Sequence, residues 1–194
     1  MSTVDEVSAD GAAAGKPLRA DARRNRERLM AAAQAAFTEN GEAASMDDIA
    51  KRAGVGPGTL YRHFPSREAL LAEVYREGIA GLAARAVELG ATEPPMTALV
   101  TFLREQVEYG RSKRGLGVAV KAMINESETM DWCRETLRTA VGDLLDRAKA
   151  DGSVRPDADR LVVLRLVHAV AYASENAPEM SDRMLDVVID GLRP

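Results

Sequence analysis

The chain has 194 residues, a net charge of −4 at pH 7 and an aromatic content of only 4%. Its single cysteine, Cys133, excludes an intramolecular disulfide and a cysteine-based zinc site, and no apolar stretch is long enough to span a membrane. Abundant Ala, Leu, Glu and Arg with few strand-forming runs predict an all-α protein. Because the N-terminus also lacks a signal-peptide pattern, we expect a cytoplasmic protein. We predict no metal site and no cofactor.

The first predicted elements are a polar tail at residues 1–18, expected to be disordered, and a helix over residues 19–40. Leu29, Ala33 and Phe37 give this helix one apolar face. Several arginines crowd its beginning, where cations oppose the helix dipole, so local stability does not explain them. Contact with DNA phosphates or with the minor groove explains these arginines. The alternative is that they are ordinary solvated side chains. These arginines are Arg19, Arg23, Arg24, Arg26 and Arg28.

Residues 45–64 combine two helix starts with a tight glycine turn. Ser45 followed by Asp48 forms a capping-box pattern, which predicts that a helix begins there. Gly54 suits the left-handed position that ends this helix, and Pro57 suits the first turn of the next one. Two short helices that meet at a glycine turn predict a helix-turn-helix, which presents its second helix to the DNA major groove.

The second of these helices carries an unusual set of side chains. Leu60 and Phe64 are four residues apart and should face the core. The other positions hold groups that can bind phosphates, including an arginine that can also recognise a guanine edge. Gly58 leaves room for close backbone approach. A three-helix packing unit with an aromatic-rich surface is the alternative. The predicted DNA-facing side chains are Thr59, Tyr61, Arg62 and His63.

Charge is distributed unevenly along the chain. Residues 1–15 carry −3, residues 16–67 carry +4 and residues 68–194 carry −5. The positive segment coincides with the predicted helix-turn-helix, where the release of counterions from DNA requires it.

Residues 66–194 are predicted to form six further helices, which brings the total to about nine. The first begins at Ser66 and runs to about residue 89, where Gly90 and the Pro94–Pro95 pair end it. The others are expected from about residue 95 and over residues 118–125, 127–150, 157–175 and 181–192, with a basic loop at residues 110–117.

Residues 161–173 are apolar on nearly every side, so a helix there must be buried on more than one face. A second subunit is the simplest cover for the extra face, and full burial inside one monomer is the alternative. With a second apolar stripe near the C-terminus, the homodimer would form a four-helix interface about a twofold axis. Two reading helices about one DNA turn apart would then select a pseudo-palindromic operator. The predicted interface residues are Leu161, Leu164, His168, Leu185, Val188, Ile189 and Leu192.

A small-molecule site is lined mainly by apolar side chains, with a few polar groups among them. Plain packing is the alternative for every candidate residue, and His168 in particular fits a core or interface histidine. Cys133 lies on an apolar stripe and is predicted to be an inert buried thiol. The candidate effector-binding residues are Tyr109, Met123, Met130, Trp132, His168 and Tyr172.

Two segments, AxxxFxxxG at residues 33–41 and SMDDIAKRAGVGPGTLYRHFPSREALL at residues 45–71, resemble the DNA-binding domain of the TetR family of transcriptional regulators. The resemblance covers about residues 23–75. It implies a helix-turn-helix domain, here 19–65, followed by a helical effector-binding and dimerisation domain, here 66–194. It also implies DNA contacts from the second helix of the motif and from the starts of the two helices that flank it. One departure is Gly56, where many members carry a serine that contacts phosphate.

These observations predict a DNA-binding transcriptional regulator, most simply a repressor that a small-molecule effector releases from a double-stranded operator, with the fourth helix transmitting the signal. An enzyme is not expected, since neither histidine has a suitably spaced nucleophile or metal-binding partner. A helical protein-interaction module without DNA binding is the alternative. The full predicted DNA-binding set is Arg23, Arg24, Ser45, Met46, Pro57, Gly58, Thr59, Tyr61, Arg62, His63, Ser66 and Arg67.

Overall fold

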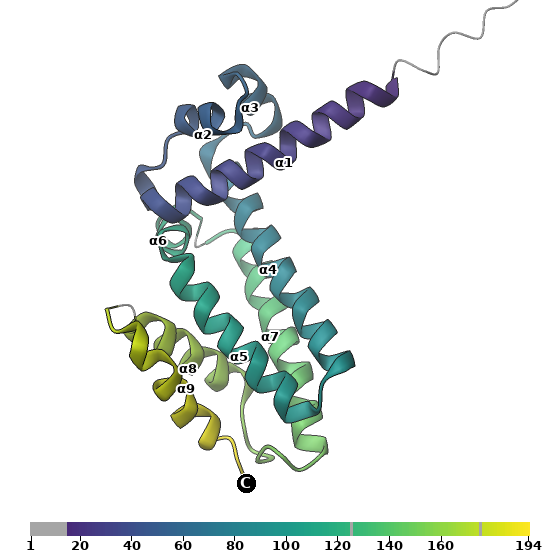
Figure 1. Cartoon of the computed structure of the whole chain (residues 1–194), viewed down its shortest axis with the longest axis vertical. Helices are drawn as coiled ribbons and strands as arrows, with labels where there is room; N and C mark the ends of the chain where they lie inside the picture. Colours follow the sequence, from purple (N-terminus) through teal and green to yellow (C-terminus); the bar gives the residue numbers. More distant parts are fainter. Residues whose placement is uncertain (1–14, 125, 175) are drawn as a thin grey trace, which may run out of the picture.

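The computed structural model of the protein describes residues 15–124, 126–174 and 176–194, and for residues 15–20 the backbone alone. In these ranges the chain forms nine α-helices, two short 3-10 turns and no strand, which confirms the all-α prediction (Figure 1). None of the described helices is long and apolar enough to cross a membrane. The elements are α1 (Gly15–Asn40), η1 (Gly41–Ala43), α2 (Met46–Ala53), α3 (Pro57–His63), α4 (Arg67–Thr92), α5 (Pro95–Ser112), α6 (Arg114–Met123), α7 (Glu128–Ala150), α8 (Arg160–Ala173), η2 (Pro178–Met180) and α9 (Ser181–Asp190).

The helix-turn-helix forms through the local signals that predicted it. The Ser45 hydroxyl accepts a hydrogen bond from the backbone N–H of Asp48 at 3.0 Å and so caps α2. Gly54 ends α2 in the left-handed region, with φ of 66°. Pro57 occupies the first turn of α3, and the Ser66 hydroxyl caps α4 by accepting from the backbone N–H of Ala69 at 3.1 Å.

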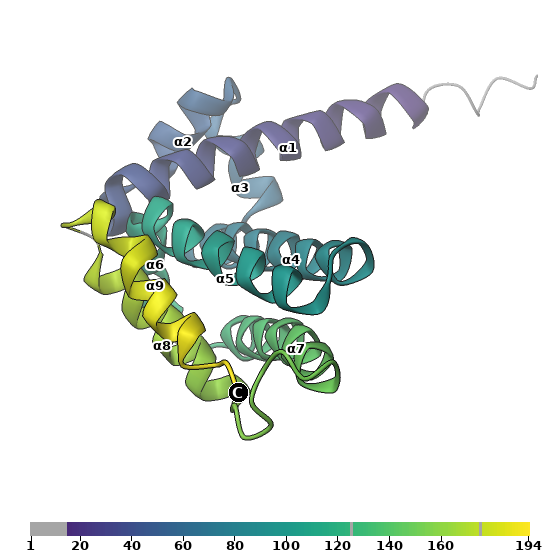
Figure 2. The same cartoon turned by 60° about the horizontal axis from the view of Figure 1, so that its bottom comes forward.

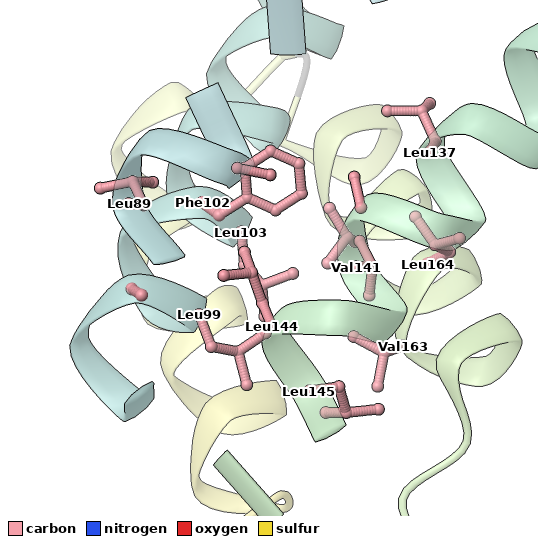
Figure 3. Packing of buried hydrophobic residues seen from close by; sticks show 14 of the residues in the cluster. Leu89, Leu99, Phe102, Leu103, Leu137, Val141, Leu144, Leu145, Val163 and Leu164 are labelled. Carbon is pink, nitrogen blue, oxygen red and sulfur yellow. The ribbon is translucent and has the colours of Figure 1, made fainter. Parts of the chain in front are cut away.

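The buried apolar side chains of the described residues form two clusters. The N-terminal core joins α1, α2, α3 and the first turns of α4 with α6 and the start of α7. The bundle core joins the rest of α4 with α5, α7, α8 and α9, and Figure 3 shows Phe102 of α5 packed near Val141 of α7. Figure 2 shows α1, α2 and α3 on one side of this bundle. Because α4 contributes to both cores, it connects the helix-turn-helix mechanically to the bundle.

The predicted basic loop at residues 110–117 is wrong. The helix α5 continues to Ser112, and α6 begins at Arg114 after a single intervening residue. Gly115 allows close packing, since a Cβ on this residue would lie 2.2 Å from the backbone oxygen of Thr38 at the end of α1. This glycine therefore permits α6 to pack on α1 and does not mark a loop.

Other predicted boundaries shift by a few residues. The helix α4 passes through Gly90 to Thr92. The helix α8 begins at Arg160 rather than Asp157, because the Asp159 carboxylate caps it by accepting from two backbone N–H groups at 2.9 Å. Of the predicted tail, residues 1–14 lie outside the described residues, and residues 15–18 belong to α1.

Candidate nucleic-acid interface

The helix α3 buries one face and exposes the other, as its sequence predicted. Leu60 is fully buried and Phe64 is 5% exposed, and both pack in the N-terminal core. Tyr61 is 49% exposed, and Arg62 is exposed beside it. Thr59 and His63 are half-buried. The predicted DNA-facing groups therefore lie on the solvent side of a helix that its two apolar residues anchor.

Arg26 of α1 contacts both α4 and the residue that ends α3. The Arg26 side chain of α1 forms an ion pair with Glu73 of α4. Its guanidinium carbon also lies 5.9 Å from the centre of the Phe64 ring, within cation–π range. Arg26 is one of the arginines predicted to face DNA. It also has a structural role, because its side chain connects α1 with α4 and with Phe64 at the end of α3.

The remaining arginines at the start of α1 lie on its surface. Arg23 pairs with Glu27 at 3.5 Å and Arg24 pairs with Asp21, and all four side chains are mostly exposed. Exposed ion pairs of this kind contribute little to stability, so a DNA phosphate could replace either carboxylate. The side chain of Arg19 lies outside the described residues.

The two helix starts that flank α3 offer backbone rather than side-chain groups. The hydroxyls of Ser45 and Ser66 are engaged as caps. The Met46 side chain is 9% exposed and packs in the N-terminal core. The N-terminal N–H groups of such helices favour anions, so any phosphate contact at these positions would come from the backbone. Pro57 and Gly58 are exposed at the start of α3.

Arg67, a member of the predicted DNA-binding set, has its guanidinium group engaged within the protein. Its guanidinium donates to the backbone oxygen of Glu42 and lies 5.8 Å from the centre of the Phe37 ring. A second, longer hydrogen bond of 3.4 Å reaches the backbone oxygen of Gly41. The guanidinium group therefore links η1 to α4, and the predicted DNA contact at this helix start is expected from the backbone.

This position predicts that Arg67→Ala destabilises the fold by about 1–3 kcal/mol, because the variant lacks the charge-assisted hydrogen bonds to the backbone. Thermal unfolding measures the change. The salt dependence of DNA binding should stay as in the unmodified protein, whereas Arg62→Ala should show the reverse pattern. An unchanged melting temperature with a reduced salt slope would instead assign the Arg67 side chain to phosphate binding.

The six candidate effector residues do not form one site. Tyr109 and His168 line a shared cavity. Met130 packs in the N-terminal core with Met123 against it. Trp132 is 36% exposed with the Arg76 guanidinium carbon 4.5 Å above its ring, and Tyr172 is 79% exposed.

The cavity lies among α4, α5, α6, α7 and α8 and has a volume of about 130 Å³. Sequence reasoning missed most of its lining, because ordinary core positions such as Ile79 and Leu137 carry no signal of a cavity. Partial burial of the imidazole lowers the pKa of His168, although the residue as a whole is exposed. The lining residues are Tyr75, Ile79, Leu82, Gln106, Tyr109, Gly110, Lys113, Leu116, Gly117, Leu137 and His168.

Cys133 is 1% exposed, and burial raises the pKa of its thiol to about 11. Since the thiolate is the reactive form, the native protein should not react with a thiol-specific chromogenic disulfide at about pH 8. After unfolding in denaturant, one thiol per chain should react. Rapid labelling of the native protein would contradict the burial.

The predicted dimer residues divide between the core and the surface. Leu164, Leu185, Ile189 and Leu192 are at most 6% exposed and lie in the bundle core of their own protomer, because α8 packs on α5, α7 and α9. These four therefore contribute to the core of the single protomer. Val188 is half-buried, whereas Leu161 and His168 are exposed. The exposed apolar side chains in this region are Leu161, Val162, Leu166, Tyr172 and Val187, which we call the α8/α9 face.

Comparison with known proteins agrees with this geometry. Residues 29–74 match the profile of bacterial regulatory proteins of the tetR family, and residues 94–194 match the C-terminal domain of SbtR-like transcriptional regulators. The chain belongs to the TetR family. The TetR-family regulator SCO0520 from Streptomyces coelicolor superposes with a TM-score of 0.74 at 35% identity, over 87% of this chain and 98% of that one.

Two further relatives cover 86% and 92% of the chain. A TetR-type regulatory protein from Mycobacterium vanbaalenii has a TM-score of 0.73 at 35% identity, with 92% of this chain and 100% of that one covered. The transcriptional repressor KstR2 of Mycolicibacterium smegmatis is 27% identical over 184 residues, which are 86% of this chain and 90% of that protein. As a TetR-family protein with an exposed helix-turn-helix, this chain is a DNA-binding transcriptional regulator.

The TetR-type reading helix carries a glycine whose side-chain position is empty. A Cβ on Gly58 would meet no protein atom within 4 Å, and its φ is not positive. Gly58→Ala should therefore stabilise the free protein by about 0.4–1 kcal/mol. It should weaken operator binding, because the added methyl group separates the α3 backbone from DNA. Thermal unfolding and a binding titration measure the two changes, and equal or stronger DNA binding would refute the close approach.

Proposed function

We propose that the protein is a homodimeric repressor that binds a pseudo-palindromic operator through α3 and leaves it when a small molecule occupies the cavity among α4 to α8. The observation that carries the DNA-binding half is the exposure of Tyr61 and Arg62 on a helix anchored by buried Leu60. A regulator of chromosomal DNA would act in the cytoplasm. Its division into residues 19–65 for DNA binding and 66–194 for effector binding and dimerisation is part of the proposal.

The proposed dimer uses the α8/α9 face. Its five apolar side chains are between 42% and 79% exposed in the single protomer. Exposed apolar groups gathered on two neighbouring helices are typical of a protein–protein interface. Full burial of α8 within one monomer, the alternative from its sequence, does not agree with this exposure. Pairing about a twofold axis would give two copies of α3 a fixed separation.

The proposed release mechanism uses two helices that reach from the cavity to the N-terminal core. Ile79 of α4 and Leu116 of α6 both line the cavity. Earlier in α4, Leu70 packs in the N-terminal core. In α6, Gly115 packs on the end of α1. A ligand that favours a wider spacing of these helices would shift the population toward dimers whose reading heads do not match the operator. The α6 contact adds a second route to the one predicted through α4.

The dimer is tested with a charge placed on the α8/α9 face. Leu166→Asp should give a monomer in analytical ultracentrifugation and lose most operator affinity, since one half-site remains. Val87→Asp is the matched control, because Val87 is 73% exposed on α4 outside this face. It should remain a dimer with unchanged operator affinity. A dimer with full operator affinity from Leu166→Asp would refute this interface.

A further inference from the structure

Two residues that line the cavity among α4 to α8 each carry a buried polar atom with no hydrogen-bond partner among the described residues. These atoms are the side-chain oxygen Oε1 of Gln106 and the hydroxyl of Tyr109. Gln106 is only 6% exposed, and both residues line the cavity. Buried polar atoms are normally paired, so two orphans beside one cavity indicate a missing partner. The following inference rests on the proposed function, because it assigns the chemistry of the effector at that same site.

The other residues that line the cavity limit the charge that the missing partner can carry. Ile79, Leu82, Leu116 and Leu137 give the wall a large apolar part, and no acidic residue of the described part of the chain lines the cavity. A cationic amine would therefore be desolvated without a counter-charge. A carboxylate could pair with Lys113, but it has no hydrogen to donate to the amide oxygen of Gln106.

A hydroxyl group can make both of the missing kinds of hydrogen bond. It donates its hydrogen to an amide oxygen and accepts one from a phenol. Burial raises the pKa of Tyr109 to about 12, so its hydroxyl stays protonated and able to donate at neutral pH. Gly78 of α4 leaves the space that the Tyr109 hydroxyl occupies, since a Cβ there would lie 2.1 Å from that oxygen. The Tyr109 hydroxyl therefore lies close to the α4 backbone at Gly78.

The volume of the cavity sets the size of the partner. At about 130 Å³ it is close to the engineered apolar cavity of about 150 Å³ that holds one benzene molecule. It is smaller than the range of about 300–1,000 Å³ that is usual for larger ligands. We propose that this cavity binds a neutral molecule the size of one six-membered ring that carries a hydroxyl group, of the phenol class, with that hydroxyl paired to Gln106 and Tyr109.

The proposal is tested by calorimetric titration of the full-length protein, free of DNA, with phenol, toluene, benzoate and benzylamine. Toluene matches phenol in size and lacks the hydroxyl. Phenol should bind at least about tenfold more tightly than toluene, which corresponds to about one buried hydrogen bond, and benzoate and benzylamine should bind more weakly than phenol. Equal affinities for phenol and toluene, tighter binding of benzoate, or no binding of any probe because water alone fills the cavity would each overturn it.

Two variants assign the selectivity to the named groups. Gln106→Leu and Tyr109→Phe should each reduce the preference for phenol over toluene to about threefold or less. Gln106→Leu should also unfold at the same or a higher temperature, because it removes an unpaired buried polar atom. Gln34→Leu, on α1 and outside this cavity, is the matched control and should keep the full preference. Full preference in both cavity variants would refute the assignment.

Operator binding is measured separately and without any probe, so the two proposals fail in different ways. Loss of phenol selectivity with intact operator binding would remove the cavity chemistry and leave the regulator. Phenol selectivity in a protein that shows no salt-dependent DNA binding would support the cavity chemistry and remove the proposed repressor.

Discussion

Replacing Tyr61 and Arg62 together with alanine should lower operator affinity by roughly a hundredfold while the fold stays intact. Removing one side chain that binds a base or a phosphate typically costs about 1–3 kcal/mol of binding free energy. Both residues are exposed on α3, and exposed substitutions usually change stability by less than about 0.5 kcal/mol. Fluorescence anisotropy over about 50 to 200 mM salt measures the affinity, and the salt slope should fall by about 1 for each phosphate that the variant no longer neutralises.

Arg104→Ala is the control for the loss of one positive charge. Arg104 lies on α5, is half-exposed and pairs with Asp186 of α9 at 2.8 Å. Its removal should leave both the affinity and the salt slope unchanged. An equal loss of affinity in this control would mean that overall charge, and not α3, determines DNA binding.

Gly115→Ala should destabilise the protein by about 1–3 kcal/mol, which lowers the melting temperature by about 2–12 °C in a chain of this length. The reason is a collision with backbone. The new Cβ would lie 2.2 Å from the backbone oxygen of Thr38 and 2.7 Å from that of Phe37, and neither can rotate away. The contact between α6 and α1 would have to open, so operator affinity should fall as well.

Gly81→Ala is the matched control, because it lies within α4 and its Cβ would meet no atom within 4 Å. This change should be neutral or stabilising. If the Gly115→Ala protein were as stable as the unmodified one, α6 would not pack against α1 as closely as described.

The N-terminal part of the fold was predictable because local chemistry determines it. The Ser45 cap, the left-handed Gly54 and Pro57 in the first turn of α3 act within a few residues of chain, and each appears in the structure as expected. The inward position of Leu60 follows from the same short-range spacing. Such signals do not depend on which helices pack together.

The features that sequence reasoning missed depend on contacts between distant segments. Gly115 belongs to the segment predicted as a loop, whereas in the structure it packs against the end of α1. Arg67 reads as a surface cation, but it contacts backbone atoms some 25 residues earlier in the chain. Leu164 and Leu166 are equally apolar in the sequence, and only the packing of α8 decides that the first is buried and the second is exposed.

The selection of bound duplexes from a random pool by the full-length protein tests the central claim most directly, because it assumes no operator. The account predicts enrichment of an inverted repeat whose half-sites are centred one or more helical turns apart, about 34–36 Å per turn. The Tyr61→Ala, Arg62→Ala double variant should fail to enrich it. Recovery of no common sequence, or of the same repeat by the double variant, would contradict the assignment of α3 as the reading helix.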